Sequence, residues 1–222
     1  MLQNYQVDQN FDETGTWLSI SDLMAGLLMV FALLLIVALA LVLTLDMFTI
    51  QLSFVAVFLA TIYPFMKRYT NLPQVVLGAA FSWGMVMAFS EAQGEIPVIA
   101  WLLFIANLCW TIAYDTIYAM VDREDDLKIG VKSTAILFAS YDRHIIFLLN
   151  ALFIAILAYI GMSHQLALPY WLGLVAAVGF LLYQQMLIHK RERDPCFKAF
   201  LNNHYVGLVI FIGLAASLPL PF

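Results

Sequence analysis

Charged residues are scarce in this 222-residue chain: Asp, Glu, Lys and Arg make up only 11% of it, against about 25% in typical soluble domains. Only ten Lys and Arg stand against fifteen Asp and Glu, so there is no basic stripe for a nucleic-acid backbone. The two cysteines, Cys109 and Cys196, form neither a disulfide framework nor a metal-ligand cluster. Hydrophobic residues reach 64% and the mean hydropathy is +0.90. These values exclude a soluble enzyme and a disordered chain, and they predict an integral membrane protein.

Long charge-free runs indicate how often the chain crosses a bilayer. A spanning helix needs about 20 predominantly apolar residues, because lipid offers no hydrogen-bond partner to exposed backbone groups. A run from His144 to His189 is too long for one span, and the polar residues around 163–169 divide it in two. The predicted fold is all-α, with about seven transmembrane helices over residues 23–45, 47–66, 69–90 (starting late because of Pro73), 96–114, two within 144–189, and 203–222.

The basic residues predict the orientation of these helices. All ten lie in the loops after the second, fourth and sixth predicted helices, which share one side of a seven-helix arrangement. The opposite loops, such as residues 91–95, contain none. Because basic loops remain in the cytoplasm, the N-terminus is predicted to be cytoplasmic and the C-terminus periplasmic. Residues 1–16 are polar and acidic, which is typical of a cytoplasmic tail.

An acidic cluster follows the fourth predicted helix, in residues 114–126 (YDTIYAMVDREDD). If that helix continues past the membrane, Asp115, Asp122 and Asp126 lie within about 20° of one direction. Three carboxylates on one stripe repel each other unless a cation lies among them, and hard oxygen ligands suit Mg²⁺. The alternative is a solvated acidic loop. Asp115 favours the functional interpretation, because it is nearest the hydrocarbon, where ionisable groups are costly.

A second polar pair lies at the inside end of the second predicted helix. Tyr63 and Lys67 are separated by four residues, so they are neighbours on one helical face. A phenol and an amine at the level of the carboxylates can bind diphosphate oxygens. Alternatively, they are ordinary membrane anchors, an interfacial tyrosine and a lysine that extends to the headgroups.

These motifs resemble the UbiA superfamily of intramembrane prenyltransferases. Residues 114–126 with 128–134 (KIGVKST) resemble the family's second aspartate-rich motif, and Tyr63 to Lys67 match its Tyr-x-x-x-Lys motif. The similarity continues through residues 63–81 (YPFMKRYTNLPQVVLGAAF), 196–200 (CFKAF) and 203–208 (NHYVGL). It covers residues 41–222 and is strongest with family members that act on 4-hydroxybenzoate in ubiquinone biosynthesis.

The resemblance implies a reaction in the bacterial inner membrane. A polyprenyl group passes from polyprenyl diphosphate to the aromatic ring of 4-hydroxybenzoate, with Mg²⁺ as cofactor. By motif position, Asp115 and Asp122 are the catalytic residues, and together with Asp126 they are the metal ligands. Asp125 is a further helper, and Tyr63, Lys67 and Lys132 bind the diphosphate.

The family pattern includes a first aspartate-rich motif, Asn-Asp-x-x-Asp-x-x-x-Asp, after its second helix, and family members usually have about nine spans. Asn4, Asp8 and Asp12 copy part of this spacing, but Tyr5 replaces the adjacent aspartate and all precede the first predicted helix. The expectation is that half of the metal site is missing. This leaves open a catalytically inactive chimeric membrane protein.

Residues 12–35 resemble a different family, the single span of flagellar-stator B subunits. There a Trp-x-x-x-x-Asp-Leu/Phe-Met pattern places an ion-carrying aspartate at the inner end of a helix, and Trp17 and Asp22 match it. The alternative is an interfacial Trp17 with Ser21 or Asp22 as an N-cap. The predicted organisation is a tail over 1–16, a stator-like leader over 17–40, and an incomplete prenyltransferase domain over 41–222. An ion-conducting or interaction module that uses Asp22 stays open as a further alternative.

Overall fold

The computed structural model describes residues 28–29, 32–33, 35–40 and 43–218. The chain divides into two compact units, residues 1–50 and 51–222, which are taken separately here. In the first unit, residues 28–29, 32–33, 35–40 and 43–44 are helical. The predicted first span, 23–45, is therefore covered only in part. The tail over 1–16, Trp17 and Asp22 lie outside the described residues.

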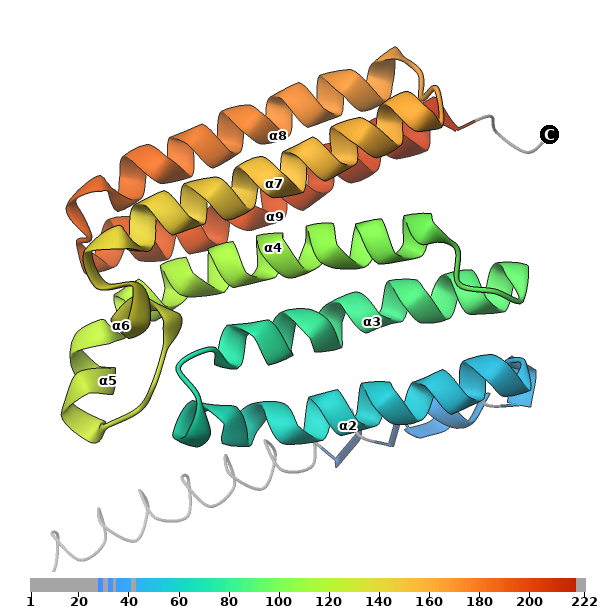
Figure 1. Ribbon diagram of the computed structural model, residues 1–222, viewed down its shortest axis with the longest axis horizontal. Coiled ribbons are helices and arrows are strands. Elements are labelled where there is room, and N and C mark those ends of the chain that lie inside the picture. Colours follow the sequence, from blue (N-terminus) through green and yellow to red (C-terminus); the bar gives the residue numbers. More distant parts are fainter. Residues whose placement is uncertain (1–27, 30–31, 34, 41–42, 219–222) are drawn as a thin grey trace, which may run out of the picture. The chain divides into compact units, whose positions relative to one another are not determined.

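The second unit consists of helices joined by short connections (Figure 1). No strand occurs among the residues that the structure describes. The helices are α2 (Met47–Tyr69, which begins in the first unit), α3 (Pro73–Gln93), α4 (Val98–Val121), α5 (Arg123–Ile129), α6 (Thr134–Phe138), the 3₁₀ turn η1 (Ala139–Tyr141), α7 (Asp142–Ser163), α8 (Leu168–Leu187), η2 (Ile188–Lys190) and α9 (Arg193–Ser217).

Six helical segments in the described residues are long and apolar enough to cross a membrane. They confirm the predicted all-α membrane fold, including the late start of α3 at Pro73 and the division of 144–189 into α7 and α8. The last helix begins at Arg193, ten residues before the predicted start. The predicted helix was restricted to a charge-free run, so its start was placed after Arg193 and Lys198, which are exposed in the first turns of α9.

Proline and glycine set the ends of α3. Pro73 occupies the first turn, where its missing N–H costs no intrahelical hydrogen bond. Gly94 follows the helix with a φ of 71°, and its N–H donates to the Ser90 carbonyl. Only glycine adopts this left-handed conformation without strain. The connection to α4 is short as a result, and the two helices run antiparallel (Figure 1).

The second unit is organised around α4, which packs against α3, α7 and α9. Two clusters of buried apolar side chains hold this arrangement. One, which includes Phe153 and Leu174, joins α4, α7, α8 and α9, and the other surrounds Ile117 and Ile146. Cys109 and Cys196 are buried as free thiols within them. Helix α3 also contacts α2, because the indole Nε1 of Trp83 donates to the Leu52 carbonyl at 2.9 Å.

Helices α8 and α9 approach most closely where two glycines face each other. A Cβ atom at Gly173 would lie 2.5 Å from the Val209 carbonyl oxygen, and one at Gly213 would lie 2.8 Å from the Pro169 carbonyl oxygen. Small residues allow such backbone contact. In lipid there is no hydrophobic driving force between helices, so close packing of this kind holds them together.

We expect Gly173→Ala to destabilise the protein by about 1–3 kcal/mol, because the new methyl group meets backbone that cannot rotate away. The matched control is Gly179→Ala on the same helix, where a Cβ meets nothing within 4 Å. This control should be neutral or slightly stabilising, since alanine favours helix over glycine. Thermal unfolding in detergent measures both variants, and equal midpoints would contradict the close α8–α9 contact.

Candidate functional site

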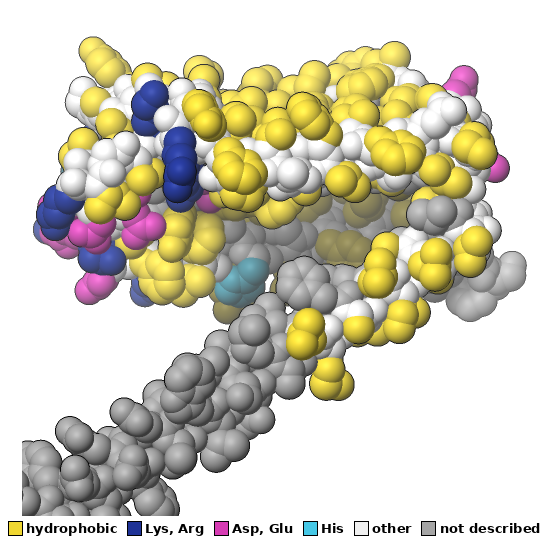
Figure 2. Space-filling view, turned by 90° about the horizontal axis from the view of Figure 1, so that it is seen from below, with side chains coloured by type: hydrophobic (Ala, Val, Ile, Leu, Met, Phe, Trp, Pro, Cys, Tyr) yellow, Lys and Arg dark blue, Asp and Glu magenta, His cyan; other side chains and the backbone are white. Residues whose placement is uncertain are grey.

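Charged side chains gather at one end of the second unit (Figure 2). Helices α2, α4 and α8 end there, while α7 and α9 begin there (Figure 1). The ten basic residues of the chain all belong to these helix ends and their connections. The loops predicted to share one side thus lie at one end of the second unit, and the predicted site residues lie at the same end.

The acidic segment does not continue α4 as one helix. Helix α4 ends at Val121, and Asp122 stands between it and α5 with φ −96° and ψ 1°. The expectation of one uninterrupted acidic stripe is therefore wrong. The break has a structural cause: Arg123, the next residue, donates from Nη2 to the Ala135 carbonyl at 2.8 Å and to Asp142 at 2.5 Å. These contacts turn the chain away from the α4 axis.

Tyr63 and Lys67 of α2 face Asp115 of α4. Asp115 interacts electrostatically with both of these side chains, and the amide of Gln74 on α3 lies beside it. Gln74 is only 2% exposed, and its Oε1 has no hydrogen-bond partner in the described part of the chain. Three helices thus bring a phenol, an amine, a carboxylate and an amide together.

Asp126 on α5 is the second carboxylate near Lys67. Its side chain is buried, and burial raises its pKa above the ordinary value for aspartate. The Lys67 ammonium opposes this shift, and the Asp122 carboxylate adds to it. Lys67 has no ion pair within 4.0 Å among the described residues. Its ammonium group therefore faces two carboxylates while its donors stay available to a ligand.

Lys132 connects this acidic segment to α2. Its backbone N–H donates to the Lys67 carbonyl at 3.1 Å, and its Nζ donates to the Tyr69 carbonyl at 3.3 Å. The structure thus gives Lys132 a role that the sequence did not suggest, as a link between the end of α2 and the segment after α5.

Asp125 points away from this group. It is exposed and pairs with Lys128 at 3.2 Å and with Arg193 at 3.6 Å. No three Asp, Glu, His or Cys side chains come close enough to hold a metal ion within the described residues. Asp126 is buried beside Asp122, and Asp115 lies on the other side of Lys67. These carboxylates fit a cation that is bound by one or two of them and whose remaining coordination positions are filled by phosphate oxygens.

Sequence reasoning missed Asp142, which is fully buried at the start of α7. Arg123 binds it from the acidic segment, and Arg191 binds it from the α8–α9 connection with hydrogen bonds of 2.8–3.1 Å. These bonds raise the pKa of Arg191 further. Asp142 lies within a loop that the sequence marks only as charged, so no spacing identifies its partners.

Comparison with known proteins identifies the family. The sequence pattern of the UbiA prenyltransferase family matches residues 21–212. The chain belongs to this family. The match begins 20 residues before the predicted domain boundary at residue 41. The family predicted from the sequence motifs is confirmed.

Two relatives show how closely the chain resembles this family. A 4-hydroxybenzoate octaprenyltransferase of Pseudoalteromonas translucida is 65% identical over 86% of the chain and 66% of its own length. One from Colwellia psychrerythraea is 64% identical over 83% of the chain and 64% of its own length. The chain thus spans slightly less than two thirds of the length of these relatives.

Solved structures support the fold. A UbiA homologue from Aeropyrum pernix K1 superposes with a TM-score of 0.67 at 22% identity, over 78% of this chain and 65% of that one. A digeranylgeranylglyceryl phosphate synthase superposes with a TM-score of 0.64 at 17% identity, over 84% of this chain and 67% of that one. At these identities the similarity establishes the helical architecture alone.

We expect Asp142→Ala to destabilise the protein by about 3–5 kcal/mol, because it leaves Arg123 and Arg191 without their shared buried counter-charge. The matched control is Asp125→Ala, which removes two exposed ion pairs and should cost less than about 1 kcal/mol. Thermal or denaturant unfolding in detergent compares the two. A similar small loss for both variants would show that the Asp142 cluster does not hold the segment in place.

Proposed function

We propose that this protein transfers a polyprenyl group from a polyprenyl diphosphate to the ring of 4-hydroxybenzoate. The names of its relatives supply the substrate class. The side-chain arrangement supplies the chemistry, since Lys67 faces Asp115 and Asp126 from an adjacent helix. An amine with free donors beside two carboxylates is suited to a diphosphate that arrives with a divalent cation.

Tyr63, Lys67 and Lys132 bind the diphosphate in this proposal. Lys67 contributes charge-assisted hydrogen bonds, which strengthen as negative charge collects on the leaving group. Lys132 places its ammonium group at the end of α2, where it already donates to a carbonyl. As the allylic C–O bond breaks, the electron pair remains with the diphosphate, and the ring carbon ortho to the hydroxyl bonds to the allylic carbon. The same ring carbon then loses its hydrogen as a proton to the released diphosphate, which restores the aromatic ring.

Asp115, Asp122 and Asp126 would hold Mg²⁺ in this proposal, with one or two of these carboxylates on each ion and diphosphate oxygens completing the coordination. Asp115 and Asp122 are the carboxylates assigned closest to the reaction. Bound Mg²⁺ supplies charge neutralisation to the leaving diphosphate. Asp122 and Asp126 contribute from the junction and first turns of α5, while Asp115 contributes from α4. Burial and neighbouring carboxylates disfavour ionised Asp126, so a cation there relieves an electrostatic cost.

We infer that the charged end faces the cytoplasm of a bacterial inner membrane, with the N-terminus inside and the C-terminus outside. The concentration of all basic residues at that end supports this orientation. The bilayer and the two substrates are the proposed partners. The apolar helices exclude water, which protects an allylic cation from hydrolysis.

We expect Asp115→Asn to lower Mg²⁺-dependent prenyl transfer by about a hundredfold or more, because it removes a charge at the leaving group. The assay uses purified protein in detergent, geranyl diphosphate and 4-hydroxybenzoate, with and without Mg²⁺. Glu124→Gln is the control, because Glu124 is exposed on the same segment. Full activity of Asp115→Asn would contradict its assigned role.

Lys67→Met should weaken binding of geranyl diphosphate about tenfold or more, whether or not turnover is observed. Titration calorimetry measures this binding in the presence of Mg²⁺. Arg68→Met is the matched control, since the adjacent side chain is exposed. Equal affinities for both variants would place the diphosphate elsewhere.

We also propose that residues 17–40 form a leader separate from the prenyltransferase chemistry. Asp22→Asn should therefore leave prenyl transfer within about twofold of the unchanged protein, as expected of a position outside the reacting groups. The geranyl transfer assay measures this directly. A loss of turnover with normal folding would make Asp22 part of the active site and overturn the separate leader.

A further inference from the structure

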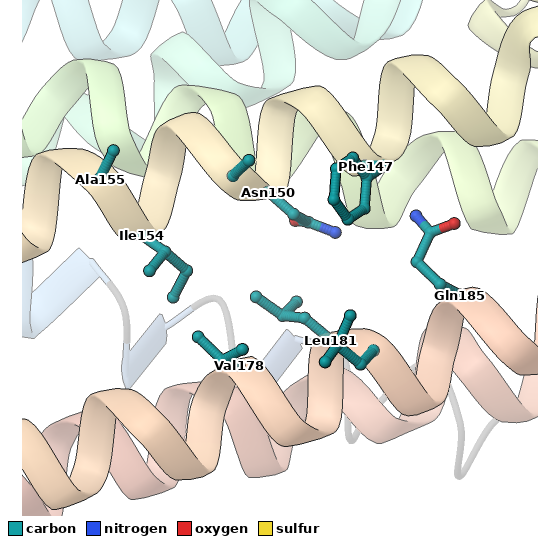
Figure 3. A pocket seen from close by; sticks show the side chains of 9 residues that line it. Phe147, Asn150, Ile154, Ala155, Val178, Leu181 and Gln185 are labelled. Atoms are coloured by element: carbon teal, nitrogen blue, oxygen red, sulfur yellow. The ribbon is translucent and has the colours of Figure 1, made fainter.

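A hollow lies between α7 and α8. It encloses about 330 Å³, and apart from two amides its walls are apolar (Figure 3). Ile154 and Val178 line one end, while Phe147, Asn150 and Gln185 lie toward the other (Figure 3). None of the groups assigned to prenyl transfer lines it.

A second hollow of about 590 Å³ continues the first toward the charged end. The two share Leu182 and Gln185, and the second adds Arg143 and His189. Together they form a single groove, which we name the α7–α8 groove.

The groove follows one face of each helix. On α7 it is lined at positions 143, 147, 150 and 154, on α8 at positions 178, 182 and 185, and on η2 at position 189. Each set has the 4, 3, 4 spacing of a single helical stripe. Eleven residues of helix rise about 16 Å, which is roughly half of a hydrocarbon core about 30 Å thick. The groove therefore has the depth of one leaflet.

The polar end of the groove carries positive charge and unmet hydrogen-bonding capacity. The Nε of Arg143 and the Oδ1 of Asn150 are buried without a hydrogen-bond partner in the described part of the chain. Asn150 is only 5% exposed. Asp142, the carboxylate next to Arg143, is already bound by Arg123 and Arg191. Buried polar groups without partners are uncommon, so this end is suited to a polar, negatively charged ligand.

We propose that the α7–α8 groove binds one anionic phospholipid of the cytoplasmic leaflet. The phosphate lies at Arg143 and His189, the ester region with its bound water lies at Asn150 and Gln185, and an acyl chain fills the apolar hollow beyond Phe147. Charge complementarity selects an anionic lipid, because in the orientation inferred above the basic end of the protein faces a negatively charged leaflet.

The test measures thermal unfolding of the detergent-solubilised protein with added lipid. Phosphatidylglycerol should raise the midpoint more than phosphatidylcholine with the same acyl chains, and sn-glycerol 3-phosphate alone should have little effect. Arg143→Gln should weaken phosphatidylglycerol binding about tenfold, as expected for a lost charge-assisted hydrogen bond. Lys198→Gln, an exposed basic residue on α9, is its control.

A second variant tests the apolar hollow without changing any charge. Ala155→Phe places a ring in the hollow and should abolish the lipid-dependent shift, whereas Ala176→Phe, on the exposed face of α8, should preserve it. If Arg143→Gln does not fold, Ala155→Phe and Arg143→Lys decide the question, with Arg143→Lys expected to retain binding.

Equal stabilisation by both lipids, or an unchanged shift in Ala155→Phe, would overturn the proposal. Competition between geranyl diphosphate and phosphatidylglycerol that depends on Arg143 would also overturn it, because the groove would then be a substrate site. Prenyl transfer is not measured, so the result is independent of the proposed enzymatic function.

Discussion

The buried ion cluster at Asp142 ties together three of the connections at the charged end of the protein. A carboxylate with no exposure is stable there only because two guanidinium groups share its charge. One guanidinium belongs to the acidic segment after α4 and the other to the connection between α8 and α9. Three connections that are distant in sequence thus meet at one side chain. The Arg123 contacts with Asp142 and with the Ala135 carbonyl accompany the turn at Asp122.

The bilayer explains why the fold was largely predictable. Lipid requires helices of a minimum length and places most charge at their ends, so hydropathy and loop charge were enough to locate α2, α3, α4, α7 and α8. The start of α9 was missed because its charged first turns lie outside the apolar run. A search for charge-free runs cannot detect helical turns that contain charged residues.

The proximity of three predicted site residues could be anticipated from the sequence, but the rest of the arrangement could not. Tyr63, Lys67 and Asp115 were identified from helix spacing and membrane depth, and the structure brings them together. The break at Asp122 and the contacts of Gln74 depend on neighbours twelve or more residues away in sequence. Pattern reasoning within one helix cannot supply such contacts. The α7–α8 groove could not be predicted from the sequence for the same reason, because its two rows of lining residues form one groove only when the helices pack side by side.

The hydrogen bond from the Lys132 backbone to the Lys67 carbonyl has an evolutionary consequence. Because main-chain atoms form it, every amino acid except proline at position 132 preserves it. Most substitutions at position 132 therefore leave the distance between the end of α2 and the acidic segment unchanged. Sequence drift there can alter the charge offered to a substrate head group while the spacing of the surrounding residues is inherited unchanged.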